Sequence, residues 1–441
     1  MALPTRDPRS TTPPVARSRA IPPRFASLRR PPGPLIALAA VLALLCLVSG
    51  LLGALDVQHR RAALDDVLQR GGPLTGAALE SYQSISDADA TAAGAFLVGD
   101  VEPPQSRDRY RTNIAEASAA LGTAASGAAG GGSAAAITRI STHLPVYTGI
   151  IETARALNRR GLPQGASYLR EASALAHTIM LPAAEELLRQ ENARLAAAQD
   201  DAAAVGWVAL GAGVLALAAL VAAQVHLARG TRRIFNRGLL AATACVLAAV
   251  TWLAIASFSA ASHGAAARES TGQVEAFANA RVMALQARAD ESLALVARGN
   301  GRPYELAYAD KAGKLNGEQG LFAVATNAAG DTTRPAVDKA VQAWRQWQDH
   351  HRDLRTADDS GDYNLAVRLA TGADPKGTAE PSTVVDQELA AAIGVATERF
   401  EAESRSARDA VAGGELVVAV LMGLAALAVG FGFAPRIREF R

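Results

Sequence analysis

The sequence predicts an all-α membrane protein, with four transmembrane helices and two antiparallel helical bundles related by internal duplication. Three observations predict this fold class. Four long apolar runs carry no charge, the short segments beside them are rich in arginine, and the two long segments between them share an order of motifs. Of the 441 residues 50% are hydrophobic and 20% are charged, and the charges all fall outside the runs. This distribution excludes an ordinary soluble enzyme, a disordered protein and a disulfide scaffold.

The uncharged runs cover residues 34–55, 205–227, 238–260 and 416–434. A helix rises about 1.5 Å per residue, so about 20 residues cross the roughly 30 Å hydrocarbon core of a bilayer. A core helix of a soluble protein is usually shorter and carries a polar stripe, which these runs lack. We therefore expect four transmembrane helices. The first is expected to be an uncleaved signal anchor, because the run is too long for a signal peptide and residues 1–33 precede it.

Arginine in the short segments predicts the orientation of the spans. Residues 1–33, 228–237 and 435–441 together hold fourteen arginines and two acidic residues, whereas the whole chain has a net charge of +2. Short arginine-rich segments remain in the cytoplasm. We therefore expect both termini and the loop inside, and two long acidic segments outside: segment 1 (residues 56–204) and segment 2 (residues 261–415). The pI near 8.6 averages the two sides and is no signal for nucleic-acid binding.

The two long segments share motifs in the same order. The matched positions in segments 1 and 2 are Asp89 and Asp290, Tyr110 and Tyr308, Tyr147 and Trp344, Arg155 and Arg352, and Gly161 and Gly361. Tyr147 and Arg155 are separated from their matches by the same offset of 197 residues. The common order favours duplication of a unit over chance similarity between two Ala-rich regions.

Each segment is predicted to form an antiparallel bundle of about four helices, whose first helix continues one span and whose last helix runs into the next. Glycine- and proline-rich breakers fall at 71–73, 99–104, 127–133 and 161–165, and at 299–303, 316–335, 358–362 and 372–382. Apolar residues recur at helical spacing in Ile137, Ile140, Leu144, Tyr147, Ile151 and Ala154, and in Val385, Leu389, Ile393, Ala396 and Phe400. This spacing is typical of a bundle seam. Because no proline or glycine occurs between Arg194 and Gly206, we expect that helix to enter the membrane unbroken.

The chain is not predicted to be an enzyme or to hold a cofactor. It contains no H-E-x-x-H, G-x-S-x-G or Walker A motif. Cys46 and Cys245 lie inside apolar runs, so neither a disulfide framework nor a cysteine metal site is expected. A partly exposed helix face explains His350 and His351 better than a metal site, because adjacent helix residues point in different directions.

Two polar clusters are the candidate sites for a ligand or partner. The first comprises Asp87, Asp89, Arg107, Arg109 and Tyr110, and the second comprises Asp290, Ser292, Tyr308 and Arg352. Arginine binds a carboxylate through two hydrogen bonds and aspartate binds an ammonium group, so such clusters suit a zwitterionic amino acid. Solvated helix faces and a docking surface for an extracellular protein are the alternatives. The candidate cytoplasmic signalling contacts are Arg229, Arg232, Arg233 and Arg237.

The chain resembles actinobacterial GlnX-type membrane proteins over essentially its whole length. The residues that carry the resemblance are 86–97, Arg107-Asp108-Arg109-Tyr110, and Gly361-Asp362-Tyr363 with Ala366. More distantly, the layout is similar to the four-helix-bundle sensor regions of bacterial chemoreceptors and histidine kinases. The GlnX resemblance implies a signalling role, an extracellular glutamine- or glutamate-binding lipoprotein as partner, and a cytoplasmic Ser/Thr kinase, protein kinase G, that reads the signal.

We therefore expect a transmembrane sensor in the cell membrane that detects extracellular amino acids, directly or through a solute-binding lipoprotein. Ligand would favour one packing of the outer bundles, and helices continuous with the spans would carry the shift inward. An accessory subunit of an amino-acid uptake system and a structural envelope protein are the alternatives. The sequence leaves the oligomeric state open, a homo-oligomer included. Residues 1–33 are expected to be disordered and to contact anionic membrane lipid.

Overall fold

The computed structural model describes residues 32–99, 102–127, 132–204, 206–231, 236–372 and 374–438. These residues are helical apart from short connections and include no β-strand, so the predicted all-α fold is confirmed. The expected disordered tail falls on residues 1–33, of which 1–31 lie outside the described residues. The chain divides into two compact units. The span unit comprises Met1–Leu55, Gly206–Leu253 and Gly414–Arg441, and the bundle unit comprises Asp56–Val205 and Ala254–Gly413.

Four helical stretches are long and apolar enough to cross a membrane: Leu35–Leu97, Gln164–Arg229, Arg237–Val296 and Ala379–Pro435. The predicted spans fall on α2 (Pro32–Asp66), α8 (Trp207–Thr231), the first half of α9 (Arg237–Val296) and α15 (Gly414–Arg438). Large apolar side chains on these helices, such as Leu44, Leu215 and Phe431, are exposed. Such surfaces are typical of helices that face lipid.

Small residues and a few polar side chains bring the helices of the span unit together. A Cβ at Gly50 of α2 would lie 2.7 Å from the Cβ of Met422 in α15, so only glycine allows this close approach. Between α8 and α9, Gln224 Nε2 donates to Thr243 Oγ1 at 2.6 Å. Close packing of small residues and interhelical hydrogen bonds are the usual means by which helices associate in a bilayer.

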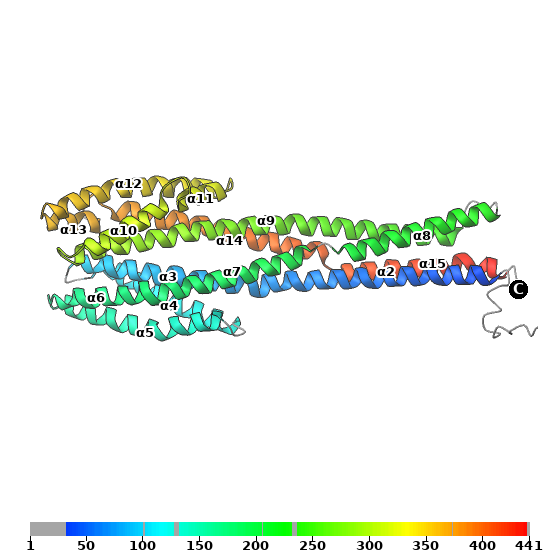
Figure 1. Cartoon of the computed structure of the whole chain (residues 1–441), viewed down its shortest axis with the longest axis horizontal. Coiled ribbons are helices and arrows are strands. Elements are labelled where there is room, and N and C mark those ends of the chain that lie inside the picture. The colour runs from blue at the N-terminus through cyan, green and yellow to red at the C-terminus, as the bar shows by residue number, and fades with distance from the viewer. Residues whose placement is uncertain are drawn as a thin grey trace, which may run out of the picture. The chain divides into compact units, whose positions relative to one another are not determined.

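Segment 1 follows α2 without a break in the helix. The π-helical turn η2 (Val67–Gly71) leads into α3 (Gly72–Leu97), and α4 (Pro104–Gly127), α5 (Gly132–Asn158) and α6 (Gln164–Leu175) follow (Figure 1). A second π-helical turn, η3 (Ala176–Met180), joins α6 to α7 (Leu181–Ala203). The breaker at 71–73 therefore does not end the helix. Each π-helical turn precedes a proline, Pro73 or Pro182, and the wider turn relieves the clash between a proline ring and the carbonyl four residues earlier.

Segment 2 repeats this order of elements with two extra interruptions. Its first helix is the second half of α9, and the others are α10 (Arg302–Leu315), α11 (Leu321–Ala328), α12 (Arg334–Asp359), α13 (Tyr363–Thr371) and α14 (Ala379–Val411). Where segment 1 has the single helix α4, segment 2 has α10 and α11. Where segment 1 has η3, segment 2 has a connection between Gly372, in the left-handed conformation, and Ala379.

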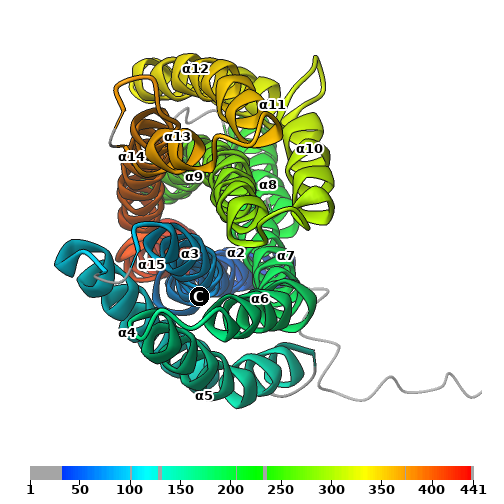
Figure 2. The ribbon, with the colours of Figure 1, turned by 90° about the vertical axis from the view of Figure 1, so that its left-hand side faces the viewer.

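The two segments share one hydrophobic core. Figure 2 shows α3–α7 on one side and α10–α14 on the other, with α3 and α9 near the middle. Side chains from both segments belong to one buried cluster, including Phe277, Tyr147, Trp344 and Trp347. Both predicted seams are buried throughout, which confirms the helical periodicity read from the sequence.

The last helix of each segment ends before the next span, contrary to the expectation. Helix α7 ends at Ala203, and Ala204 has an extended ψ of 122°. Helix α14 ends at Val411, and Gly413 adopts a φ of +70°, which stops a helix at little cost only in glycine. Acidic side chains in both final turns, such as Asp201 and Asp409, oppose the negative end of the helix dipole and favour these ends.

The first helices behave as predicted. The 60-residue α9 is about 90 Å long and runs without interruption from a predicted span into segment 2.

Candidate functional site at the interface of the two segments

Helices α3 and α9 carry buried polar side chains where the two segments meet. The buried polar residues of α3 include Ser86, Asp87 and Asp89, and those of α9 include Asp290 and Glu291. A buried carboxylate is costly unless it is paired and hydrogen-bonded. The partners of these acids therefore define the chemistry of the interface.

Asp87 is held by two residues of α4. Arg109 Nε and Nη2 donate to its two carboxylate oxygens at 2.9 and 2.8 Å, and Asn113 Nδ2 donates at 2.7 Å. Arg109 is on one face of α4 with Asn113 because residues four apart are neighbours on a helix. The pair of Asp87 and Arg109 from the first predicted cluster is thus in direct contact.

The same arginine reaches across to segment 2. Arg109 Nη2 also donates to Asp386 Oδ2 of α14 at 2.6 Å, and Arg281 Nε of α9 donates to Asp386 Oδ1 at 2.7 Å. Arg281 Nη1 returns to segment 1 by donating to Gln83 Oε1 at 2.7 Å. Burial favours the neutral acid, but Arg281 and Arg109 outweigh it and lower the pKa of Asp386. This charged network links the two segments.

A cleft of about 360 Å³ lies beside the network. Residues of α3, α4, α9, α13 and α14 line it, so both segments form its walls. Its polar lining includes Thr91, Ser106, Arg109, Arg288, Glu291, Ser292, Thr378 and Ser382. Burial, and then the nearby Arg109, lower the pKa of Arg288. Sequence reasoning did not select Arg288, because its position in an Ala-rich helix gives no sign that it faces a cleft.

Asp89 faces a different side of α3 and is satisfied within segment 1. Ser173 Oγ of α6 donates to it at 2.8 Å, and Tyr147 of α5 donates at 3.3 Å. His177 Nε2 of η3 lies 3.0 Å from Asp89 Oδ2, the same oxygen that accepts from Ser173. Burial lowers the pKa of His177, but Asp89 raises it by more, so the net shift is upward.

Glu291 is the corresponding centre in segment 2. Trp347 Nε1 and His351 Nδ1 of α12 hydrogen-bond to Oε2 at 3.0 and 2.6 Å, and Thr378 donates to Oε1 at 2.6 Å. His351 Nε2 also lies 3.1 Å from Glu305. Burial lowers the pKa of His351, yet the two glutamates raise it to about 9. His351 is buried, in contrast to the partly exposed face expected for it.

The two matched tyrosines are buried beside these centres. Tyr110 lies under the guanidinium of Arg155, 4.1 Å from the ring centroid, and Tyr308 stacks on His351 at 3.8 Å. Neither hydroxyl hydrogen-bonds to a described residue. Burial raises the pKa of both tyrosines. They therefore serve as packing groups with a polar edge rather than as proton donors or acceptors near neutral pH.

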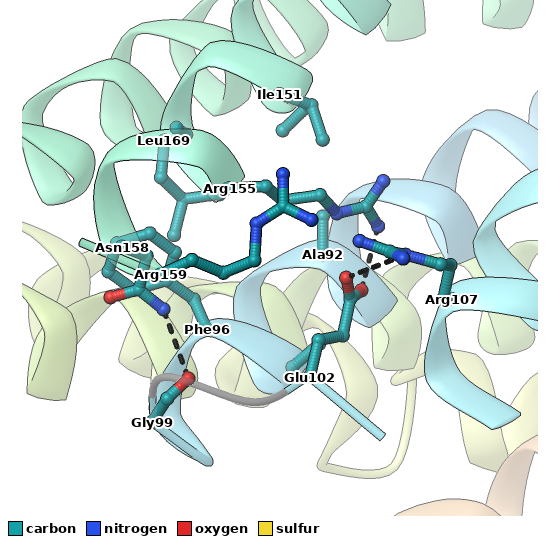
Figure 3. Close-up of a pocket in the computed structure, with 12 residues that line it drawn as sticks. Ala92, Phe96, Gly99, Glu102, Arg107, Ile151, Arg155, Asn158, Arg159 and Leu169 are labelled. Atoms are coloured by element: carbon teal, nitrogen blue, oxygen red, sulfur yellow. Dashed lines mark hydrogen bonds and ion pairs between the residues drawn. The ribbon is translucent and has the colours of Figure 1, made fainter. Parts of the chain in front are cut away.

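A smaller cavity of about 160 Å³ lies inside segment 1 (Figure 3). Glu102 points into its polar end, where Arg155 Nη2 and Arg107 Nε lie 2.9 and 3.4 Å from the carboxylate. The other wall is apolar and includes Phe96 and Ile151. Glu102 is paired with two arginines, and a third, Arg159, also lines this cavity.

The structure distributes the predicted site residues over several places. In the first cluster, Asp87 and Arg109 are together, Asp89 is on another face of α3, Arg107 pairs with Glu102, and Tyr110 is buried under Arg155. In the second cluster, Asp290 accepts from Lys311 at 2.5 Å, Ser292 lines the cleft, and Tyr308 stacks on His351. Arg352 does not join them, because it is 74% exposed and pairs with Asp349 on its own helix.

The offset of 197 residues matched Arg352 to Arg155, but the structure shows that these two arginines make different contacts. Arg155 contacts Glu102 in segment 1, and Arg355 contacts Glu305 in segment 2 at 3.5 Å. Arg355 therefore takes the place that the sequence match gave to Arg352, one helical turn away.

The arginines predicted to contact a cytoplasmic protein are described only in part. Arg229 and Arg237 are exposed, near the end of α8 and at the start of α9. Arg232 and Arg233 lie outside the described residues.

Sequence reasoning missed six polar residues of the interface: Arg281, Arg288, Glu291, His351, Thr378 and Asp386. One signal was present, because Asp386 directly follows Val385 of the predicted seam and an acid beside a seam requires a partner. Among the described residues, no group of three His, Cys, Asp or Glu side chains has an arrangement that suits a metal ion. The described polar groups of the interface instead pair with one another through hydrogen bonds and ion pairs.

The described residues form an all-α fold with four helices apolar enough to cross a membrane, and a polar interface joins the two segments. Residues 63–200, which run from the end of α2 to α7, match the family model described as an actinobacterial sensor domain. No curated protein and no solved structure matched the chain. The match falls on segment 1 and supports a sensing role for that domain.

Proposed function

We propose that the chain is a multi-pass membrane sensor that detects extracellular amino acids and signals to a separate cytoplasmic Ser/Thr protein kinase. The observation that carries this proposal is the sensor-domain match over residues 63–200, in a chain with four apolar helices. The fourteen arginines of the short segments favour an orientation with both termini inside and segments 1 and 2 outside.

The amino acid reaches the sensor either free or on a solute-binding lipoprotein. Its arrival favours one packing of α3 against α9, where the charged network of Arg109, Asp386 and Arg281 joins the segments. Packed helices respond through shifts of about 1–2 Å or small rotations rather than by continuous deformation. Ion pairs of this kind can exchange partners while the apolar core remains packed.

The first helix of each segment carries the shift toward the membrane. Helix α9 and the joined helices α2, η2 and α3 are continuous with predicted spans, whereas α7 and α14 end at Ala203 and Val411. A helix interrupted by an extended residue transmits a displacement less directly than an unbroken one. The cytoplasmic arginines, including Arg229 and Arg237, then present the signal to the kinase.

The test compares a deletion strain with strains that carry the wild-type chain or the Arg109→Gln variant. We expect deletion and Arg109→Gln to abolish the change in phosphorylation of kinase substrates after glutamate or glutamine is added, with the initial rate of amino-acid uptake intact. The exposed variant Arg352→Gln is the matched control and should behave as wild type. Lower uptake with an unchanged phosphorylation response would reject the sensor and favour an uptake subunit.

A further inference from the structure

Arg288 gives the cleft between the segments an unbalanced positive charge. Asp87 and Asp386 pair with Arg109 and Arg281. Arg288 lines the cleft, is partly buried, and has no carboxylate of a described residue within 4.0 Å and no hydrogen bond to one. Because this guanidinium is partly withdrawn from water and has no protein partner, its environment favours an anionic ligand.

Two hydroxyls of the cleft are also free to donate to a ligand. The hydroxyls of Ser292 and Ser106 make no hydrogen bond to a described residue. Glu291 is the single carboxylate among the lining residues of the cleft, and it already accepts from Trp347, His351 and Thr378. The cleft therefore offers the Arg288 guanidinium and two hydroxyl donors to the acceptor oxygens of a ligand.

We propose that this cleft binds a small organic carboxylate whose carboxyl group pairs with Arg288 and accepts hydrogen bonds from the serine hydroxyls. This inference rests on the proposed sensing function and names its binding site. The planar guanidinium matches a carboxylate through two parallel hydrogen bonds, which a spherical anion cannot use equally well. The volume of about 360 Å³ suits a small molecule rather than a protein segment.

The location of the cleft explains how such a ligand would act on the fold. Arg288 and Ser292 belong to α9, whereas Thr91 belongs to α3 and Ser106 to α4. A carboxylate bound there contacts both first helices at once. It therefore stabilises one arrangement of segment 1 against segment 2, which is the change that the proposed sensor must transmit.

The test uses the full chain in lipid nanodiscs with L-glutamate, L-glutamine, succinate and sulfate as separate probes. Calorimetric titration of the wild type is expected to show binding of at least one carboxylate. The variant Arg288→Gln should weaken that binding by about 30-fold or more, because a buried charge pair loses one partner. The control Arg352→Gln removes an exposed arginine and should bind as the wild type does.

Thermal melting without ligand separates a binding role from a structural one. Arg288→Gln should melt no lower than the wild type without ligand, because it removes an uncompensated charge. Added carboxylate should raise the melting temperature of the wild type but not that of Arg288→Gln. Wild-type affinity in Arg288→Gln, binding of sulfate alone, or binding of no probe overturns the proposal. A carboxylate bound at Arg288 without any phosphorylation response would instead reject the proposed kinase signalling and leave the site intact.

Discussion

Each segment buries one acid among an aromatic donor, a hydroxyl and a histidine, but the donors come from different positions. Asp89 binds Tyr147, Ser173 and His177, whereas Glu291 binds Trp347, Thr378 and His351. The histidine of segment 1 comes from the π-helical turn η3, and the histidine of segment 2 comes from α12. Each copy therefore hydrogen-bonds one buried carboxylate, but the two copies use different residues as its partners.

The two centres differ in how strongly they are enclosed. The side chain of His177 is 21% exposed and contacts one carboxylate, whereas that of His351 is 8% exposed and lies between Glu291 and Glu305. A charge is held more strongly where water is excluded and two opposite charges are near. We therefore expect the stability of segment 2 to depend more on Glu291 than the stability of segment 1 depends on Asp89.

The largest expected effect is the loss of Glu291. The variant Glu291→Ala leaves Trp347 Nε1, Thr378 Oγ1 and His351 without a shared acceptor and should lower the free energy of unfolding by about 3 kcal/mol. Asp89→Ala should cost about 2 kcal/mol, because His177 is nearer to water and can lose its proton. Chemical denaturation of the full chain in detergent measures both values. Equal losses, or a larger loss for Asp89→Ala, would contradict the proposed difference between the segments.

The second comparison uses pH. The pKa of His351 is raised to about 9 in the folded chain from about 6.5 in the unfolded one, so the folded state holds an extra proton between these values. Its contribution to stability is complete below about pH 6.5 and is lost as pH rises through about 9. From pH 7 to pH 9 the loss should be about 2 kcal/mol.

Matched histidine variants assign that pH dependence to one segment. His351→Gln should remove most of the fall in stability between pH 7 and pH 9, as measured by denaturant midpoints at a series of pH values. His177→Gln should remove less of it. Its pKa is also raised, against burial, by Asp89 and by the more distant Asp290, but only one carboxylate contacts the ring. An unchanged slope in His351→Gln would show that the proton is held elsewhere.

The third prediction concerns the contact between the segments rather than either centre. Arg109 of segment 1 and Asp386 of segment 2 should show a coupling energy of about 1.5 kcal/mol in a double-mutant cycle of Arg109→Gln and Asp386→Asn. Partial exposure of Arg109 keeps this value below that of a fully buried pair. The cycle of Arg352 and Asp349, both exposed on one helix, is the control and should give less than about 0.5 kcal/mol.

The fold was largely predictable because apolar runs and helical seams leave a clear pattern. Every residue of the seams that begin at Ile137 and Val385 is buried. The sequence placed Asp87 and Arg109 in one cluster as ligand-binding groups, and the structure pairs them with each other. Pattern reading could not fix the register between the repeats. A shift of about one helical turn keeps the apolar face in place, so Arg352 and Arg355 satisfy the sequence pattern almost equally well.

The cleft was hidden from sequence reasoning for a different reason. Helices α3 and α9 lie in the middle of the bundle unit, so polar residues on several of their faces are buried and a simple amphipathic pattern is absent. The sequence therefore gives no sign that Arg288 and Glu291 line a cleft. The end of α7 was missed because the non-helical backbone at Ala204 has no strong residue preference, whereas Gly413, which follows α14, is a breaker present in the sequence.

The smallest expected effect tests a position at which the two segments are alike. Gly161, at φ +67°, lies just after the end of α5, and Gly361, at φ +86°, lies just after the end of α12. The next residues, Leu162 and Asp362, donate backbone hydrogen bonds to the carbonyls of Leu157 and Ala357, as in a Schellman motif. Nothing lies within 4 Å of a Cβ added at either glycine, so the cost of a substitution there is a backbone cost.

Alanine at either position should therefore lower the free energy of unfolding by about 1 kcal/mol, with the same value in both segments. The control is Gly149→Ala inside α5, which also has nothing within 4 Å of the added Cβ. It should raise stability by about 0.5–1 kcal/mol, because alanine suits a helix interior better than glycine. Unequal losses for Gly161→Ala and Gly361→Ala would mean that the two copies differ in their backbone at this position. If the two glycine variants lose equal stability while Asp89→Ala and Glu291→Ala lose different amounts, the segments differ in their buried polar side chains and not in this part of the backbone.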